Sequence, residues 1–344
     1  MEASTATIPP LLQTNIGLLT CPTCGGDLRL VDGVELSCED CDRTFASDSG
    51  IPLLFWPNDW QGKTDVTEIV KAFYEETPFP NYDGVDTAAL LRQKADSSMF
   101  AKLVDEQLPA GAKILEAGCG TGQFSNYLGM RWGRTVFGTD ICLNSLRLGQ
   151  RFKIDNEIEN VAFVQMNLFQ PAFKAETFDA VICNGVLHHT SDPELGFRSL
   201  AQLVAPGGHI IIGLYNRWGR IPTNIRRTIF KLSGNRLQFL DSRLRDQSID
   251  ETRRHTWFMD QYKHPHESKH TIGQVLRWFD RAGFDFVHGI PKPTPFSPFM
   301  PDEPLFTLDP AGGAFDHFLV QGNMLAGGGK EGGFFVMIGK KRQS

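Results

Sequence analysis

Three closely spaced glycines between two carboxylates could hold a ligand that contains a ribose. An apolar stretch that begins at Lys113 runs into Glu116 and then into glycines at positions 118, 120 and 122, and a second apolar stretch ends on Asp140. The glycines leave the turn free of side chains, so a ligand can lie against backbone N–H groups at the start of the next helix. The carboxylate of Asp140 can accept hydrogen bonds from both hydroxyls of a ribose. The segment therefore predicts a site for a nucleotide-like cofactor.

The spacing of the glycines distinguishes two classes of cofactor. A dinucleotide-binding GxGxxG motif would need its third glycine at the position of Gln123. The ExGxGxG pattern that ends at Gly122 instead closely resembles the class I S-adenosylmethionine-dependent methyltransferases. This resemblance implies S-adenosylmethionine as the cofactor, with Glu116 near its cationic amino and sulfonium groups. It also implies that Asn167, which stands where the family usually has aspartate, accepts a hydrogen bond from the adenine amino group. The cofactor-binding residues that we expect are Glu116, Gly118, Cys119, Gly120, Gly122, Asp140, Ile141, Asn167, Leu168 and Asn184.

The elements that position these residues alternate between strand and helix from Ala112 onward. Apolar runs predict a helix at 193–204 and strands at 112–116, 134–139, 161–165, 178–184 and 209–215. They are followed by a helix at 269–282 and by strands at 284–289 and 334–339. This alternation predicts a parallel sheet with helices on both faces. The order resembles the Rossmann-like, seven-stranded α/β sheet of the methyltransferase family, whose sixth and seventh strands form an antiparallel hairpin.

Two histidines and a tyrosine follow the predicted fourth and fifth strands. His188 and His189 come shortly after Asn184, and Tyr215 ends the next strand. At the carboxyl ends of parallel strands, such side chains could take a proton from a methyl acceptor. The alternative is that the Gly-Val-Leu-His-His string is a scaffold element shared by class I enzymes with different acceptors. We expect the catalytic residues to be His188, His189 and Tyr215.

Four cysteines near the start of the chain form two CxxC pairs, Cys21 with Cys24 and Cys38 with Cys41. Four thiolates suit tetrahedral zinc and leave no open coordination position, so the predicted site is structural. The alternatives are reduced pairs without metal and a redox-active pair. The stretch up to Leu54 resembles the small zinc domain of the tRNA-methyltransferase activator family, which implies an activator fused in cis. The sequence departs from that family at 44–47, which affects the expected partner surface more than the fold.

The predicted organisation has three parts. Residues 1–60 form a structural zinc domain with an N-terminal arm, 61–110 a linker and a pre-core helical lid, and 111–344 the methyltransferase domain. A helix at 66–76 must stop before the two prolines that precede Tyr82. In methyltransferases that resemble this chain, such a pre-core segment lies over the cofactor as a lid; the alternative is an anchor that packs on the core. Cap insertions are expected at about 217–267 and 291–333.

The two insertions contain the residues most able to select an acceptor. Between 217 and 255 there are ten Lys or Arg against four Asp or Glu, which would attract an anionic acceptor; the alternative is a solvated amphipathic cap. His264, His266 and His270 could bind a metal, but hydrogen-bonding loop residues or acceptor contacts are the favoured interpretation. The second insertion has phenylalanines that could line the site or pack in the ordinary way, namely Phe296, Phe299, Phe306, Phe315 and Phe318.

Bulk properties are those of a soluble enzyme. The chain has 344 residues, a formal charge of −6 and seven cysteines without the pattern of a disulfide framework. Neither an export signal nor a membrane-spanning stretch is expected, so we predict a cytoplasmic location and no membrane partner. The oligomeric state stays open.

The predicted function is S-adenosylmethionine-dependent methyl transfer to a small or medium-sized metabolite, anionic or partly aromatic, by in-line displacement. One alternative is an RNA or protein methyltransferase, although the low isoelectric point argues against a nucleic-acid partner. The second alternative is a methyltransferase-like binding subunit without activity. Intact Glu116, Asp140 and glycines argue against it.

Overall fold

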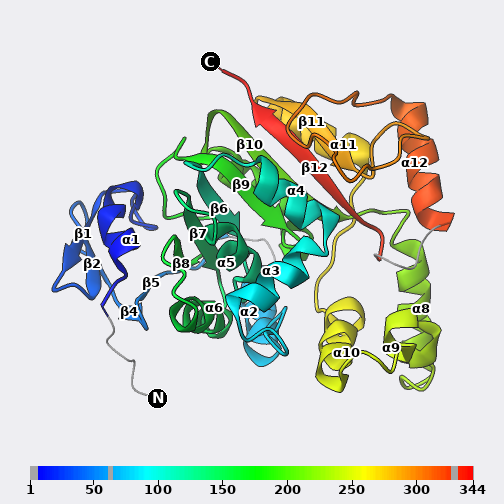
Figure 1. Cartoon of the computed structure of the whole chain (residues 1–344), viewed down its shortest axis with the longest axis horizontal. Coiled ribbons are helices and arrows are strands. Elements are labelled where there is room, and N and C mark those ends of the chain that lie inside the picture. Colours follow the sequence, from blue (N-terminus) through cyan, green and yellow to red (C-terminus); the bar gives the residue numbers. More distant parts are fainter. Residues whose placement is uncertain (1–6, 61–64, 327–331, 344) are drawn as a thin grey trace.

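The computed structural model describes residues 7–60, 65–326 and 332–343. Parts of three predicted segments lie outside this range: 1–6 of the N-terminal arm, 61–64 of the linker and 327–331 of the second insertion. In the described part, a large mixed sheet crosses the molecule, the N-terminal module (blue) lies at one end of it, and the helices of the insertions lie at the other (Figure 1).

Seven strands of this sheet are those predicted from the sequence, and they confirm the methyltransferase-like order. Five run parallel, namely β8 (Val161–Met166), β7 (Thr135–Asp140), β6 (Lys113–Ala117), β9 (Phe178–Asn184) and β10 (Val204–Tyr215). β12 (Phe334–Lys341) then pairs antiparallel with both β10 and β11 (Phe284–Ile290). β10 begins five residues before the predicted His209, with an irregularity between Val204 and His209.

The sheet is larger than predicted because the N-terminal module adds two strands to it. β5 (Ile51–Leu54) pairs in parallel with β8, with Leu53 opposite Gln165 and Leu54 opposite Met166, and β4 (Ser47–Asp48) pairs with β5. The result is a nine-stranded sheet in place of the expected seven. The physical reason is that β8 would otherwise be an edge strand with unpaired backbone groups.

The rest of the module consists of small elements that pack on the same edge. They are α1 (Pro10–Thr14), η1 (Ile16–Leu18), β1 (Leu28–Val31), β2 (Glu35–Cys38) and β3 (Thr44–Phe45). The backbone N–H of Thr20 donates to the carbonyl of Ala172 at 3.0 Å, and Arg147 makes a bidentate ion pair with Asp48 at 2.8 and 2.9 Å. Leu12, Leu19 and Leu36 are fully buried in the same hydrophobic cluster as the central strands. The module and the sheet therefore share one core.

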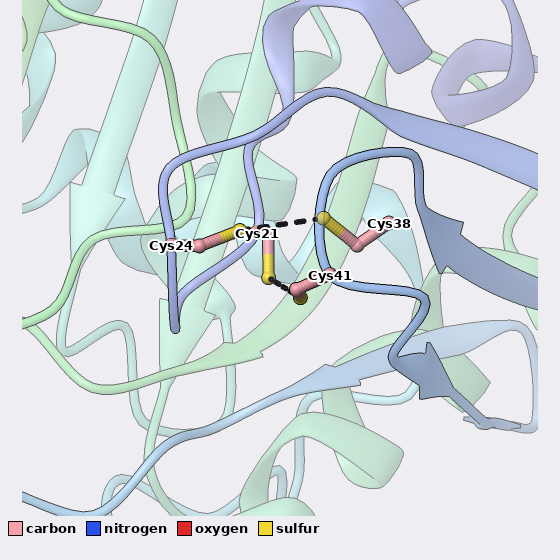
Figure 2. A group of neighbouring side chains, drawn as sticks. All are labelled: Cys21, Cys24, Cys38 and Cys41. Carbon is pink, nitrogen blue, oxygen red and sulfur yellow. Dashed lines mark hydrogen bonds between the residues drawn. The ribbon is translucent and has the colours of Figure 1, made fainter.

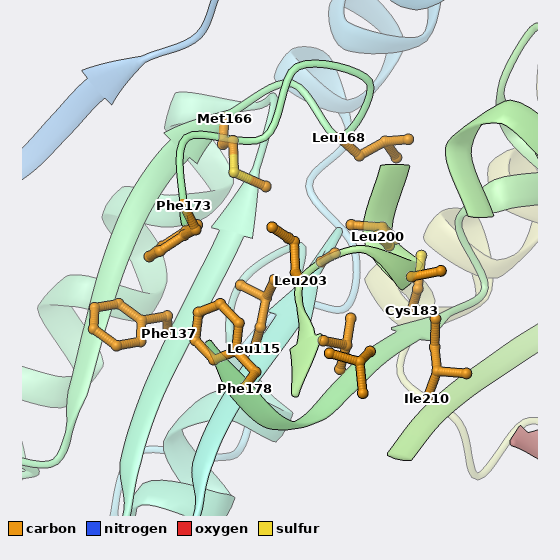
Figure 3. Packing of buried hydrophobic residues seen from close by; sticks show 14 of the residues in the cluster. Leu115, Phe137, Met166, Leu168, Phe173, Phe178, Cys183, Leu200, Leu203 and Ile210 are labelled. Carbon is orange, nitrogen blue, oxygen red and sulfur yellow. The ribbon is translucent and has the colours of Figure 1, made fainter. Parts of the chain in front are cut away.

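Alternate residues of the central strands enter two hydrophobic clusters, one on each face of the sheet. Leu115 and Cys183 point into the cluster that also contains Phe137, Phe178 and Leu200 (Figure 3). Ile114 and Ile182 belong to the cluster on the other face. This alternation is what the two-residue period of a strand buried on both faces requires.

Helices cover both faces. The first cluster includes residues of α7 (Pro193–Ala201) and α11 (Ile272–Arg281), which the sequence predicted with slightly longer bounds. The second includes residues of α4 (Met99–Gln107), α5 (Gln123–Gly129) and α6 (Leu143–Asp155). α2 (Thr67–Glu76) is the helix expected at 66–76, whereas α3 (Ala88–Asp96) and α4 were not predicted individually.

The insertions are mainly helical. The first contains α8 (Ile221–Leu232), η3 (Gln238–Leu240), α9 (Ser242–Arg245), α10 (Glu251–Phe258) and the π-helical turn η4 (Met259–Lys263), around a small cluster of Phe230, Phe258 and Tyr262. The second contributes α12 (Ala314–Ala326). Within the described residues, none of the helices combines the length and the apolar character that crossing a bilayer requires.

Candidate functional site

The glycine turn between β6 and α5 adopts a backbone conformation that side chains would oppose. Gly118, Gly120 and Gly122 have φ angles of 75°, 55° and 71°. A Cβ atom on Gly118 would lie 2.3 Å from Val186, and one on Gly122 would lie 2.4 Å from Phe163. Both positive φ and close packing therefore require glycine here. The turn leads directly into α5, so its N–H groups gather at the start of that helix.

Asp140 ends β7 beside this turn and stabilises it. One carboxylate oxygen accepts from the backbone N–H of Gly120 at 2.8 Å, and the other accepts from that of Cys142 at 2.9 Å. Each oxygen can still accept one further hydrogen bond, which is what two ribose hydroxyls would need. Burial raises the pKa of the Asp140 carboxyl, against the lowering effect of these backbone donors.

Glu116 is the second carboxylate at the turn, and it is 7% exposed. It accepts a hydrogen bond from the Ser125 hydroxyl. Burial raises its pKa to about 8, more than the Ser125 hydrogen bond lowers it, and the charge of nearby Asp140 adds to the rise. A buried carboxyl of this kind favours a cationic ligand, because a positive charge would restore the ionised form.

The Phe79–Tyr82 segment is docked against the glycine turn. A Cβ on Gly120 would lie 2.3 Å from the Phe79 carbonyl oxygen. The Thr121 hydroxyl donates to the Pro80 carbonyl, and the Tyr82 hydroxyl donates to the Thr121 carbonyl at 3.0 Å. The side chain at Gln123, where a dinucleotide site would have glycine, donates to the Asn81 carbonyl at 2.6 Å. The segment thus packs on the core like an anchor, while Phe79 and Pro80 also line the cavity described below.

Asn167 links the predicted adenine position to the chain that leaves the N-terminal module. Its amide nitrogen donates to the Trp56 carbonyl at 2.9 Å and to Asn58 Oδ1 at 2.8 Å. Its amide oxygen accepts from the backbone N–H of Phe169 at 3.1 Å and keeps a second lone pair. Asn58 in turn donates to Asp65 and Thr67 at the start of α2. We call residues 56–58 the strap, since they connect the module, Asn167 and the start of α2.

A cavity of about 960 Å³ is lined by the turn, by residues of α2 and of the Phe79–Tyr82 segment, and by residues of the first insertion. This volume is near the upper end of the range for small-molecule sites, roughly 300–1,000 Å³. Most of the predicted site residues line it, namely Glu116, Gly118, Cys119, Gly120, Asp140, Ile141, Asn167, Leu168, Asn184, His189 and Tyr215. Gly122 and His188 do not. Gly122 packs on Phe163, and His188 lies behind the wall of the cavity.

The two histidines differ in their surroundings. His188 is 1% exposed, neither ring nitrogen has a hydrogen-bond partner among the described residues, and burial lowers its pKa well below the ordinary value. His189 Nδ1 lies 2.8 Å from the His266 carbonyl oxygen. Because a carbonyl only accepts, Nδ1 carries the proton and Nε2 keeps the lone pair. Burial lowers the pKa of His189 to about 4, so its ring is neutral at pH 7.

Sequence reasoning missed a polar cluster that lies beside the histidines. Tyr74 donates from its hydroxyl to Asp260 at 3.3 Å, and the Gln261 amide donates to Asp260 at 2.8 Å and to the Tyr215 hydroxyl oxygen at 2.7 Å. All four side chains line the cavity. The sequence signal was weak, because Asp260 and Gln261 lie in an insertion and only the tertiary fold brings Tyr74 to them.

Two of the ten basic residues of the first insertion, Arg220 and Arg227, form ion pairs within the protein. Arg220 is fully buried and pairs with Glu267 at 2.6 and 3.0 Å, and Arg227 pairs with the same carboxylate at 3.0 Å. Burial would raise the pKa of Glu267, but these arginines outweigh it and lower that pKa to about 2. Of the ten basic residues, Arg243 lines the cavity, with its guanidinium 4.1 Å from the centre of the Trp257 ring.

The remaining residues of the insertions are dispersed. His264 stacks on His189 with ring centres 3.6 Å apart, and His270 interacts with Ser268 at 2.9 Å. No metal-like cluster includes them among the described residues. Of the five phenylalanines in the second insertion, Phe299 lines the cavity and Phe306 packs near the core, so a continuous apolar wall is absent from the described part. The other three, which are more than half exposed, are Phe296, Phe315 and Phe318.

The four N-terminal cysteines converge on one point, as Figure 2 shows. Their sulfurs lie within 4.8 Å of one another, with Cys21 and Cys41 3.8 Å apart and Cys24 and Cys38 3.4 Å apart. Tetrahedral zinc with Zn–S bonds of about 2.3 Å would separate its sulfurs by roughly 3.8 Å. The arrangement of the donors therefore fits the expected metal. No disulfide joins any of the seven cysteines, all of which are described.

Known proteins provide an independent comparison. Residues 90–289 match a family described as a methyltransferase domain. An uncharacterized protein of Synechococcus sp. is 30% identical over an alignment of 249 residues, which covers 64% of this chain and 60% of that protein. The ubiquinone biosynthesis O-methyltransferase of Salmonella arizonae is 35% identical over 111 residues, which are 32% of this chain and 45% of that enzyme. This chain thus spans less than two thirds of the length of either relative.

A solved structure has a similar fold. PKMT2 from Rickettsia typhi in complex with AdoHcy superposes with a TM-score of 0.50 at 17% identity, covering 69% of this chain and 51% of that chain. At this identity the similarity concerns the fold.

Proposed function

The chain belongs to the methyltransferase-domain family of S-adenosylmethionine-dependent enzymes, and from this premise we propose that it methylates a small or medium-sized metabolite. The main support is the cavity of about 960 Å³, which is lined by the glycine turn and by residues of α2, the Phe79–Tyr82 segment and the first insertion. A chamber lined in this way suits an acceptor that enters whole. An RNA or protein acceptor would have to insert a single base or side chain.

The residues proposed to hold the cofactor surround the turn. Asp140 would accept from the ribose hydroxyls, Glu116 would face the cationic amino and sulfonium groups, and Asn167 would accept from the adenine amino group through its amide oxygen. When bound, S-adenosylmethionine supplies an electrophilic methyl group. The chain's own residues would orient the acceptor, with Tyr215 and the neutral His189 at the cavity wall. His188 contacts Tyr215 from behind, with ring centres 4.3 Å apart.

The side chains that line the cavity further restrict the chemical class of the proposed acceptor. Phe100, Phe124 and Phe299 line one part of the cavity, and the polar cluster around Asp260 lines another. A molecule with an apolar or aromatic body and a polar group fits this division. The similarity to an enzyme named as a ubiquinone biosynthesis O-methyltransferase also supports a small organic acceptor.

We further propose that Cys21, Cys24, Cys38 and Cys41 bind one structural zinc ion. The sulfur separations support this assignment, and a module this small needs the stabilisation that metal binding supplies. Four protein ligands leave no position for a substrate, so the ion would take no part in methyl transfer.

The test is labelled methyl transfer from S-adenosylmethionine into a cell extract divided by size. One portion of the macromolecular fraction is treated with ribonuclease and another with protease. The proposal predicts label in the small-molecule fraction that survives both enzymes. Label destroyed by ribonuclease or by protease would contradict it and identify the RNA or protein alternative.

A further inference from the structure

In the polar cluster of Tyr74, Tyr215, Asp260 and Gln261, the Tyr215 hydroxyl is an unused donor and the Asp260 carboxylate can still accept hydrogen bonds. Both hydrogens of the Gln261 amide are engaged, one by the Tyr215 hydroxyl oxygen and one by Asp260. Because Tyr215 accepts from Gln261, its own O–H hydrogen is directed elsewhere, and no described residue accepts it. The Asp260 carboxylate accepts from Tyr74 and Gln261, and each of its oxygens has a further lone pair.

The π-helical turn explains why Asp260 and Gln261 reach the cavity together. α10 ends at Phe258 and continues as the π-helical Met259–Lys263 turn. The two adjacent side chains, Asp260 and Gln261, line the cavity, while Tyr262 packs in the small core of the insertion. Single π-helical turns of this kind occur frequently at functional sites. Asp260 is only 8% exposed, so its charge faces the cavity and not bulk water.

We propose, building on the function proposed above, that Tyr215 and Asp260 bind a neutral hydroxyl group of the acceptor and that Asp260 takes its proton. A hydroxyl oxygen can accept from Tyr215 while its hydrogen is donated to Asp260. A carboxylate or phosphate has no hydrogen to donate and would be repelled by Asp260. A protonated amine has no lone pair for Tyr215. The pair of residues therefore selects a hydroxyl over carboxylates, phosphates and protonated amines.

Methyl transfer to the hydroxyl balances in atoms and charge with Asp260 as the proton acceptor. The O–H bond breaks, and its proton passes to a carboxylate oxygen of Asp260. An electron pair of the hydroxyl oxygen forms the new bond to the methyl carbon, and the pair of the broken carbon–sulfur bond stays on sulfur. One positive sulfonium and one negative carboxylate become a neutral thioether and a neutral carboxyl, next to a methyl ether.

The surroundings of Asp260 suit a proton acceptor. Burial raises the pKa of its carboxyl, while His264 and Arg220 oppose the rise. Its other titratable neighbours are Tyr74, whose pKa burial raises well above the ordinary value, and Tyr215, whose pKa burial raises to about 12. Both phenols therefore stay protonated near pH 7. Since Asp260 must be ionised to act, turnover should rise with pH through its pKa.

The experiment compares full-length wild type with Asp260→Asn, which keeps the size of the side chain but removes its basicity. The acceptor probe is the size-filtered small-molecule extract of cells that produce the chain, with labelled S-adenosylmethionine. Asp246→Asn, an exposed aspartate of the same insertion, is the matched control. AdoHcy affinity is measured for each protein by calorimetry, and the labelled product is identified by mass spectrometry.

We expect the labelled product of the wild type to be a methyl ether. Asp260→Asn should lower turnover by roughly 10²-fold or more and leave the affinity for AdoHcy unchanged. Asp246→Asn should change neither quantity. Tyr74→Phe should move the acid limb of kcat/KM to higher pH, because the Tyr74 hydrogen bond lowers the pKa of Asp260. If Asp260 had only a structural role, Tyr74→Phe would not shift the acid limb of kcat/KM.

Three results would overturn this inference while leaving the proposed function intact. They are a product methylated on an amine or a carboxylate, wild-type turnover in Asp260→Asn, and an acid limb of kcat/KM that Tyr74→Phe does not shift. Failure of the wild type to bind AdoHcy or to label any small molecule would overturn the proposed function itself.

Discussion

At the scale of single residues, Asp140 and Glu116 make hydrogen bonds within the protein and also line the cavity. Asp140 stabilises the glycine turn through the N–H groups of Gly120 and Cys142, yet both of its oxygens keep a lone pair for a ligand. Glu116 is held by Ser125 and surrounded by the core. Such groups are costly to bury without a partner. Their placement at a cavity is therefore best explained by a ligand that completes their hydrogen bonds and charge.

Glu116 should make cofactor binding depend on pH. Its pKa of about 8 means that it is largely protonated at pH 6 in the free protein. A ligand with an ammonium group favours the carboxylate, so binding releases a proton and the affinity for AdoHcy should rise by up to about tenfold per pH unit between about pH 6 and 8, then level off. Calorimetry across this range measures the effect. Glu116→Gln is the control, whose affinity should be flat and close to that of the wild type at pH 6. A flat wild-type profile would show that Glu116 does not face the cation.

At the scale of elements, two segments between β5 and β6 hold the site in place. The Phe79–Tyr82 turn rests on Gly120 and Gln123, and the strap at 56–58 is bound to Asn167. Both segments come from outside the core strands, and each contacts a predicted cofactor-binding residue. We infer that their docking and the binding of cofactor are mutually dependent.

Gly120→Ala should displace the Phe79–Tyr82 segment. The added methyl group would lie 2.3 Å from the Phe79 carbonyl oxygen, and a φ of 55° costs an alanine about 1–2 kcal/mol. We expect weaker AdoHcy binding and faster proteolysis near residues 78–82, measured by calorimetry and by limited digestion. Gly111→Ala is the matched control, because a Cβ there meets nothing within 4 Å. Equal digestion rates in the two variants would contradict the docking of the Phe79–Tyr82 segment on the turn.

The same elements show what could be read from the sequence and what could not. Strands with continuous apolar runs, such as Phe178–Asn184, and the turn at Glu116–Gly122 follow local rules and were predicted closely. The pairing of β5 with β8, the strap on Asn167 and the contact of Tyr74 with Asp260 join residues more than a hundred positions apart. Local periodicity contains no information on such contacts. The ion pair of Arg220 with Glu267, 47 positions away, could not be predicted for the same reason.

At the scale of the whole molecule, the N-terminal module is part of the enzyme's structure and not an appendage. It extends the central sheet at β8, contributes fully buried side chains to the main core and is tied to α6 by the Asp48–Arg147 ion pair. Stability of the module should therefore be coupled to stability of the methyltransferase domain.

Loss of zinc should destabilise the whole chain. We expect about one zinc per purified chain, and we expect Cys24→Ser to lose the metal and to melt at a lower temperature in a single transition. Metal analysis and calorimetric unfolding measure the two effects. Glu39→Gln, an exposed acid beside the second pair, should retain both metal and stability. A metal-free wild type, or a separate low-temperature transition for the module, would be inconsistent with this account.

The central claim is that cofactor and acceptor meet inside one cavity, and a crystal structure of the full chain with AdoHcy tests it most directly. We predict that the ribose hydroxyls lie within hydrogen-bonding distance of Asp140 and that the sulfur faces the chamber lined by Tyr215 and Asp260. AdoHcy bound outside this cavity, or with its sulfur directed to the open surface, would contradict the account.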